Sequence, residues 1–290
     1  MDPAAKTLVI KYRNPKPLPT KQLDSLQVKL KNNPYARALA TPVRCCSILQ
    51  ARLPSFFLTC YRLVAHPETE LLWYLPQGLT KPPQWPRDSI ATEQPSLSSP
   101  PDGPSSYALS SASLLQQITS TPRKQKTFTW HQLGSRQHLK PLPDIIWRQD
   151  MHEFVLRLLR KRVWDEAKHM AVQRSRCATL EEVQWKKQVG FVLWFGRPPG
   201  KHTDSSTREV GDGPAKYATI VTRRPTTKAA VYNLPRLLGH ELTGALRKIF
   251  ELEPHNEAVV VKLRRSTAPA VMWLWKLEGY LAGFEKRQED

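Results

Sequence analysis

The sequence lacks the long apolar segments that would place it among membrane-spanning proteins. No apolar run approaches the roughly 18–20 residues that cross a bilayer, because the longest candidates, FVLWFG and VMWLWKLEGYLAGF, are short or interrupted by charge. The opening residues MDPAAKTLVIKYRNPKPLP contain no apolar core of a secretory signal. We therefore expect a chain with no transmembrane segment.

Cysteine is scarce, and its spacing fits no metal or redox motif. The four cysteines are Cys45, Cys46, Cys60 and Cys177. Adjacent cysteines do not readily bond to each other, and no C-x-x-C pair is present. We expect these thiols to be buried and reduced, as in a compartment poor in disulfides, and we expect no metal site.

Motifs of known catalytic chemistry are also missing. There is no G-x-G-x-x-G, Walker-type loop, G-x-S-x-G or H-E-x-x-H pattern. GRPPGK has the wrong spacing for a phosphate loop, and its prolines lack N–H donors. His240 has no visible nucleophile partner, and Asp165 and Glu166 are expected to form local ion pairs. The chain is thus predicted to have no catalytic residue, no cofactor and no small-molecule substrate.

What the sequence does contain is a large excess of basic residues. It has 44 Lys+Arg against 25 Asp+Glu in 290 residues, which gives a formal net charge of +19. Such an excess costs stability through self-repulsion, and a polyanionic partner relieves that repulsion. Nucleic acid is the favoured partner, and an anionic membrane surface is the alternative.

Composition divides the chain into three parts, and the order of expected elements predicts an α+β fold class. Residues 1–78 are expected to form a small N-terminal unit built from a strand, a helix and a hairpin. Residues 79–143 are rich in Pro and Ser and are predicted to be a linker, with no stable fold from about 79 to 122. Residues 144–290 are expected to form a two-layer α+β domain that begins with a long basic helix.

In the N-terminal unit, KTLVIKY is predicted to be a strand, and Thr20 is predicted to cap a helix through KQLDSLQVKLK. SFFLTCYRLVA and ELLWYLP predict a β-hairpin, because they are rich in aromatic and branched residues. Between helix and hairpin lies NPYARALATPVRCC, where Pro34 and Pro42 are expected to interrupt regular structure. We expect this stretch to form an extended basic strap.

In the C-terminal domain, apolar spacing predicts a helix from a cap at Asp144 to about Arg176. A short helix TLEEVQWKKQV and three strands, GFVLWF, KYATIVTRR and EAVVVKLRR, are expected to follow. One helix is predicted from Asn233 to Phe250, with Pro235 at its first position. Thr267 is expected to cap the last helix. The expected apolar stripe of the long helix is Met151, Val155, Leu158, Leu159, Val163 and Met170, and that of the last helix is Ala270, Trp273, Leu274, Leu277, Leu281 and Phe284.

Three basic segments are candidates for RNA contact. The first is the strap, the second is the basic and aromatic end of the linker, and the third is the long helix, where basic residues outnumber acidic ones. The predicted RNA-binding residues are Arg37, Arg44, Arg52, Arg123, Lys124, Lys126, Arg157, Arg160, Lys161 and Arg162. Trp275, which departs from the apolar stripe of its helix, is a further candidate for an outward anchor.

The stretch NPYARALATPVRCCSILQARLPSFFL, followed by HPETELLWYLP, resembles a group of fungal mitochondrial proteins associated with the mitochondrial ribosome. The resemblance covers only this part of the chain. It implies an accessory ribosomal component in the mitochondrial matrix, with ribosomal RNA and neighbouring ribosomal proteins as partners.

The leading hypothesis is a structural, RNA-contacting protein of the mitochondrial ribosome that supports mitochondrial translation and has no catalytic activity. One alternative is a mitochondrial RNA-processing, ribosome-assembly or translation factor that uses the same basic surfaces. A second alternative is an enzyme of unrecognised family, with a site near His240.

Overall fold

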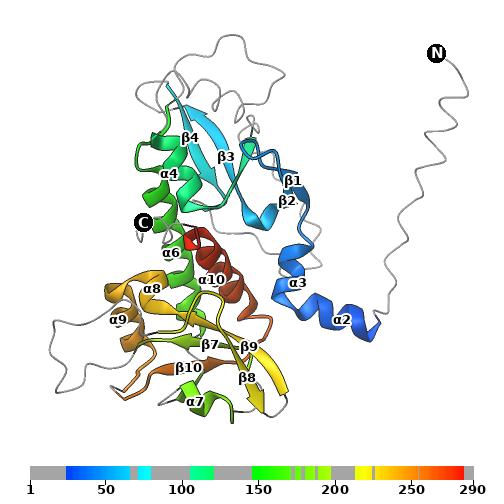
Figure 1. Ribbon diagram of the computed structural model, residues 1–290, viewed down its shortest axis with the longest axis vertical. Helices are drawn as coiled ribbons and strands as arrows, with labels where there is room; N and C mark the ends of the chain where they lie inside the picture. Colours follow the sequence, from blue (N-terminus) through cyan, green and yellow to red (C-terminus); the bar gives the residue numbers. More distant parts are fainter. Residues whose placement is uncertain are drawn as a thin grey trace, which may run out of the picture.

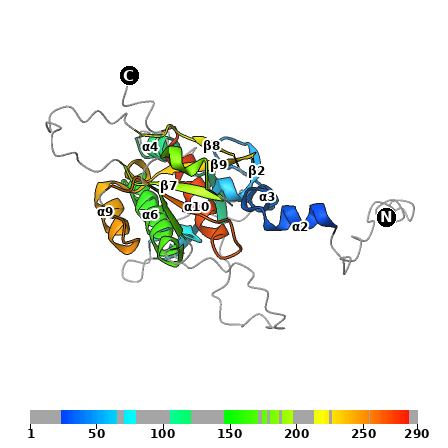
Figure 2. The same cartoon turned by 90° about the horizontal axis from the view of Figure 1, so that it is seen from below.

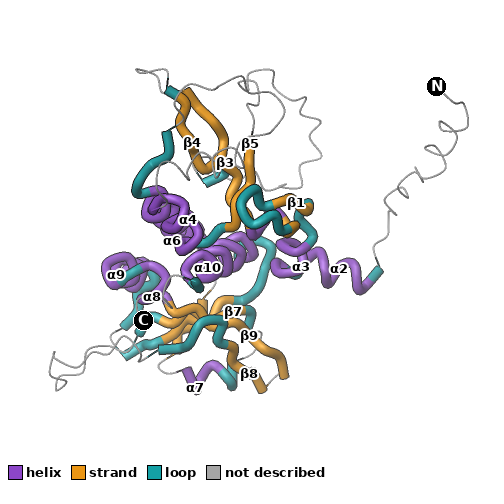
Figure 3. The backbone as a smooth tube through the Cα atoms, turned by 45° about the horizontal axis from the view of Figure 1, so that its top comes forward, coloured by secondary structure: helices purple, strands orange, loops and turns teal. Residues whose placement is uncertain are grey.

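The computed structural model of the chain has an α+β fold in which helices form a central layer between two β-sheets (Figure 1; Figure 3). One sheet has three strands and the other has five, and a separate two-stranded hairpin lies beside them. The described residues are 24–65, 71–79, 105–120, 146–170, 174–177, 180–186, 189–196, 213–223, 226–253 and 255–283.

The three-stranded sheet is built around β3 (Leu58–Ala65), which pairs antiparallel with β4 (Leu72–Gln77) on one side. This pairing confirms the hairpin predicted from SFFLTCYRLVA and ELLWYLP. Tyr61 and Tyr74 are buried on the face that meets the helices. The predicted strand KTLVIKY precedes the described residues.

The third strand of this sheet and one of the helices come from the segment predicted to be a linker. β5 (Ser105–Leu109) pairs with β3, and α4 (Ala112–Ser120) follows it. The prediction that residues 79–122 lack a stable fold is therefore wrong for residues 105–120. The Pro- and Ser-rich composition of this segment drew attention away from its helical periodicity. Ala112, Leu115 and Ile118 recur every three residues, and all three are buried. The rest of the predicted linker, apart from the buried Leu79, lies outside the described residues.

The five-stranded sheet is mixed. β7 and β9 run parallel, and all other neighbouring strands are antiparallel. Three of its strands, β7, β8 and β10, confirm the predicted ones. The pattern missed the other two, β6 and β9. In spatial order the strands are β6 (Arg174–Cys177), β10 (Ala258–Val261), β7 (Phe191–Trp194), β9 (Thr226–Asn233) and β8 (Thr219–Arg223).

The helix predicted to begin at Asn233 is two helices. Asn233 does cap the first, since its side chain accepts a hydrogen bond of 3.1 Å from the N–H of Arg236. α8 (Leu234–Leu238) then ends at Gly239, whose φ of 87° suits glycine and strains other residues. α9 (His240–Ile249) begins directly after it.

The long basic helix, α6 (Met151–Met170), is shorter than predicted. Asp144, its predicted cap, lies outside the described residues, and residues 146–150 form a β-bridge and a turn instead of a helical turn. Beyond the other end, Arg174–Cys177 form strand β6. The predicted apolar stripe is largely confirmed, because the buried side chains include Met151, Val155, Leu159, Val163 and Met170.

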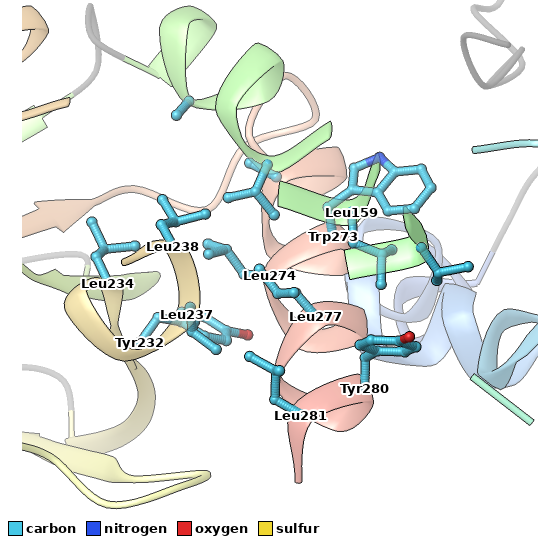
Figure 4. Packing of buried hydrophobic residues seen from close by; sticks show 14 of the residues in the cluster. Leu159, Tyr232, Leu234, Leu237, Leu238, Trp273, Leu274, Leu277, Tyr280 and Leu281 are labelled. Atoms are coloured by element: carbon cyan, nitrogen blue, oxygen red, sulfur yellow. The ribbon is translucent and has the colours of Figure 1, made fainter. Parts of the chain in front are cut away.

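The last helix, α10 (Ala268–Leu281), lies at the centre of the molecule and packs against α6, α8, α4 and α3 (Pro34–Leu39). Figure 4 shows Leu274 and Leu277 facing Leu237 of α8. The predicted stripe is confirmed from Ala270 to Leu281, and Phe284 lies outside the described residues. Thr267 precedes the helix, but its side chain makes no capping bond and closes the turn at Arg264.

One hydrophobic core joins both sheets to the helical layer. Its buried side chains come from the small sheet (Tyr61), from α4 (Leu115), from α6 and α10, and from the large sheet (Val259). Residues from all three compositional parts of the chain thus contribute to the same core.

Residues 24–54, which we call the N-terminal arm, extend from this core (Figure 1; Figure 2). The arm is not the extended strap that was predicted. Asn33 accepts a hydrogen bond of 3.0 Å from the N–H of Tyr35 and so caps a helix whose first residue is Pro34. The predicted cap Thr20 lies outside the described residues, and Asp24 caps the first helix. The elements of the arm are α2 (Ser25–Asn32), α3 (Pro34–Leu39), β1 (Val43–Cys45) and β2 (Arg52–Pro54).

Candidate nucleic-acid interface

The N-terminal arm displays basic side chains on both faces of its hairpin. Arg44 on β1 pairs with Leu53, while Arg52 on β2 pairs with Cys45, so the two arginines point to opposite faces. Both are exposed, as predicted, and Arg37 on α3 is half-buried. The Arg44 guanidinium lies 5.9 Å from the centre of the Tyr107 ring, which holds it near β5. Two full positive charges are thus accessible to solvent here.

Helix α2 adds Lys29 and Lys31 to this surface, and none of its residues is buried. Its start is held by a capping box, in which Asp24 and Gln27 exchange side-chain and backbone hydrogen bonds. Leu26 and Leu30 are also exposed. An isolated helix of eight residues has little stability in water. Because no residue of α2 is buried, we expect a partner to cover this helix.

No acidic residue lies between positions 25 and 67, a stretch that includes nearly the whole arm. Within the arm the only acidic residue is Asp24, the cap of α2, so positive charge predominates there. A surface of this kind attracts phosphate over distances of about one Debye length, ~8 Å at physiological salt.

The cations of α6 are arranged differently. Arg157 is exposed but lies 3.2 Å from the carboxylate of Asp150. The same carboxylate accepts two hydrogen bonds of 2.8 Å from Arg148, which hold the pKa of Asp150 below its usual value. Lys161 is exposed on the solvent face of the helix. Only Arg157 and Lys161 of the four predicted α6 residues thus point to solvent.

Arg160 and Arg162 reach inward. Arg160 donates a hydrogen bond of 3.0 Å to the carbonyl of Leu237, and burial lowers its pKa. Arg162 donates a hydrogen bond of 3.0 Å to the carbonyl of Leu79. Positions 160 and 162 flank the buried stripe, and their long side chains reach these carbonyls, so both arginines are half-buried. Their contact with RNA stays a prediction. The predicted RNA-binding residues Arg123, Lys124 and Lys126 lie outside the described residues.

Trp275 is not the outward anchor that was considered. Its ring centre lies 5.1 Å from that of Tyr35, 5.2 Å from that of Phe56 and 5.3 Å from that of Phe57. Tyr35 also makes a 3.1 Å contact between its hydroxyl and that of Tyr232. Trp275 therefore anchors the base of the N-terminal arm to α10 from the inside.

Three of the cysteines lie in three different environments. Cys46 is buried, as expected, and its sulfur accepts a hydrogen bond of 3.3 Å from the N–H of Leu109. Cys45 is exposed, so the expectation of burial is wrong for it, and Cys60 is half-buried. Within the described part of the chain no group of three His, Cys, Asp or Glu side chains is placed to hold a metal ion. His240 is exposed in the first turn of α9.

Sequence reasoning missed a further basic surface at one end of the large sheet. It contains Trp185, whose side chain is 59% exposed, and cations from three loops. The sequence contains a signal for this basic surface, because residues 213–240 and 258–277 include no acidic residue.

No family model, no curated protein and no solved structure matches this chain. Among the residues that the structure describes, no helix combines the length and the apolar character needed to span a membrane.

Proposed function

We propose that the chain is a structural, RNA-contacting component of the mitochondrial ribosome. The observation that carries the proposal is the N-terminal arm, which has no acidic residue after its cap Asp24, extends from the core and exposes Lys29, Lys31, Arg44 and Arg52. Contacts from these side chains to phosphates would position the protein without reading base sequence.

The mitochondrial and ribosomal part of the proposal rests on the resemblance described above. The resembling stretch includes α3, the β1–β2 hairpin and most of β4. The arm and the sheet beside it are therefore the part of the molecule for which an assembly-specific role is proposed. Leu26 and Leu30 of α2 are exposed, and they would give the arm an apolar surface for contact with a neighbouring protein.

The test is co-sedimentation of the tagged full-length chain with mitochondrial ribosomal particles after a high-salt wash. A structural component stays with the particles in a fixed ratio to other ribosomal proteins. Recovery only in free, low-mass fractions would contradict the proposal, and a substoichiometric amount would identify an assembly or translation factor instead.

A further inference from the structure

The missed basic surface lies where several loops meet at one end of the five-stranded sheet. The parallel strands β7 and β9 start toward the same end of the sheet, and because Phe191 pairs with Ala230, β9 extends four residues beyond the start of β7. The last residue of β10, Val261, pairs with Phe191. The turn after β10, the β8–β9 hairpin and the residues before β7 therefore share this end.

Trp185 stands at this end on the segment that follows α7 (Leu180–Val183). The Arg223 guanidinium lies over its ring, 4.2 Å from the ring centre. A backbone hydrogen bond of 2.9 Å from the N–H of Arg223 to the carbonyl of Gln184 fixes the two segments together. The indole is held in place by a cation on one face and is 59% exposed.

The charge around this tryptophan is predominantly positive. The acidic residues of the segment are Glu181 and Glu182 in the first turn of α7. The described cations of this sheet end are Lys186, Arg223, Lys228, Lys262, Arg264 and Arg265.

We propose that Trp185, backed by Arg223, is a stacking site for an unpaired base of single-stranded RNA. The proposal rests on the proposed RNA-binding function and adds the kind of RNA recognised at this site. A flat aromatic face beside cations accepts a splayed base while the cations hold the flanking phosphates. A duplex keeps its bases stacked inside and offers none to a single indole ring.

The experiment compares two probes with the same phosphates. One is a single-stranded RNA of about twelve nucleotides, and the other is an abasic oligomer of the same length. Binding of each to the full-length chain is measured by fluorescence anisotropy at one salt concentration. We expect the parent to prefer the base-bearing RNA by about tenfold or more.

The variants separate stacking from charge. Trp185→Ala is expected to remove the preference for the base-bearing RNA, and Trp185→Phe is expected to keep most of it. Lys228→Gln is the matched charge control on β9, and it is expected to lower the affinity for both probes equally. Because Trp185 and Lys228 are exposed, the variants at these positions should have thermal unfolding midpoints near that of the parent.

The outcomes distinguish this inference from the function on which it rests. If the parent binds both probes equally, or if Trp185→Ala keeps the preference, the stacking site is wrong while RNA binding stands. If the full-length chain binds neither probe at low salt, the proposed RNA-binding function itself fails.

Discussion

The N-terminal arm and helix α6 are both strongly basic, but they hold their charges in different ways. The arm exposes its cations in a segment whose only acidic residue is the cap Asp24. On α6, Arg157 is paired with Asp150, and Arg160 is hydrogen-bonded to a backbone carbonyl. The arm therefore offers charge to a partner, whereas much of the charge on α6 stabilises the fold.

The difference teaches that a count of basic residues overestimates the charge available for binding. Arginine has a long apolar stem and several donors, so it readily serves as an internal hydrogen-bond donor. Lys161 lies between two such arginines and is exposed. Three consecutive cations on one helix thus have two different roles.

The largest expected effect comes from removing the charges of the arm. The combined change Lys29→Gln, Lys31→Gln, Arg44→Gln and Arg52→Gln should weaken RNA binding by about three powers of ten, at ~1 kcal/mol per contact. The salt slope of binding should fall by about 3. A salt titration of affinity measures both quantities.

The control for this prediction changes four exposed cations on α6 and α9. The control substitutions are Arg157→Gln, Lys161→Gln, Lys168→Gln and Lys248→Gln. An equal loss of affinity in both quadruple variants would show that only total charge matters and would remove the distinction between arm and helix.

The next largest effect concerns the base of the arm. Trp275→Ala should lower the free energy of unfolding by about 3 kcal/mol, because it removes an aromatic ring that packs on Tyr35, Phe56 and Phe57. Trp275→Phe should lower the free energy of unfolding by less, because it keeps an aromatic ring at this position. Denaturant unfolding provides the measurement, and an unchanged midpoint for Trp275→Ala would mean that the arm does not depend on α10.

A smaller effect separates neighbouring cations on α6. Arg160→Gln and Arg162→Gln should each lower the free energy of unfolding by about 1–2 kcal/mol, because each loses a charged hydrogen bond to a carbonyl. Lys161→Gln is the matched control and should stay within about 0.5 kcal/mol of the parent. Equal stability of all three variants, measured by denaturant unfolding, would place Arg160 and Arg162 in solvent after all.

The smallest effect is a pH dependence from Lys276, a half-buried cation at the base of the arm. Its ammonium donates a hydrogen bond of 3.0 Å to the carbonyl of Leu58, and burial lowers its pKa to about 8. Between that value and its ordinary pKa the unfolded chain binds more protons than the folded one, so stability rises with pH. We expect a gain of less than about 1 kcal/mol from pH 8 to 9, discounted for partial exposure.

Lys276→Met should remove this rise when unfolding is measured at both pH values. Burial also raises the pKa values of Tyr232 and Tyr280. These two tyrosines lower the stability of the folded chain only when the pH approaches the ordinary pKa of tyrosine, which lies above this pH range. A rise of equal size in Lys276→Met would assign the pH dependence to another group.

Local periodicity predicted the elements whose burial follows from neighbouring residues. The β3–β4 hairpin and the apolar stripes of α6 and α10 were found in this way. Strand β5 and helix α4 were missed, because their surroundings are rich in Pro and Ser and their stability comes from β3 and α6, far away in the sequence. Propensity and composition carry no information about such partners.

The same limit applies to the candidate interface. The exposure of Arg44 and Arg52 followed from local sequence, whereas the inward direction of Arg160 and Arg162 depends on Leu237 and Leu79. The placement of Trp185 over the β8–β9 hairpin likewise depends on a distant residue, Arg223. A side chain that reaches another element cannot be assigned a role from its own helix alone.

The contacts at the base of the arm have a consequence for the order of folding. Tyr35 and Tyr232 are 197 residues apart, and Lys276 and Leu58 are 218 residues apart. Contacts at such separations form late, because a long loop must close before they are made. During synthesis the arm is translated long before its aromatic partner on α10. In the interval between the two, the arm lacks the ring that fixes its base.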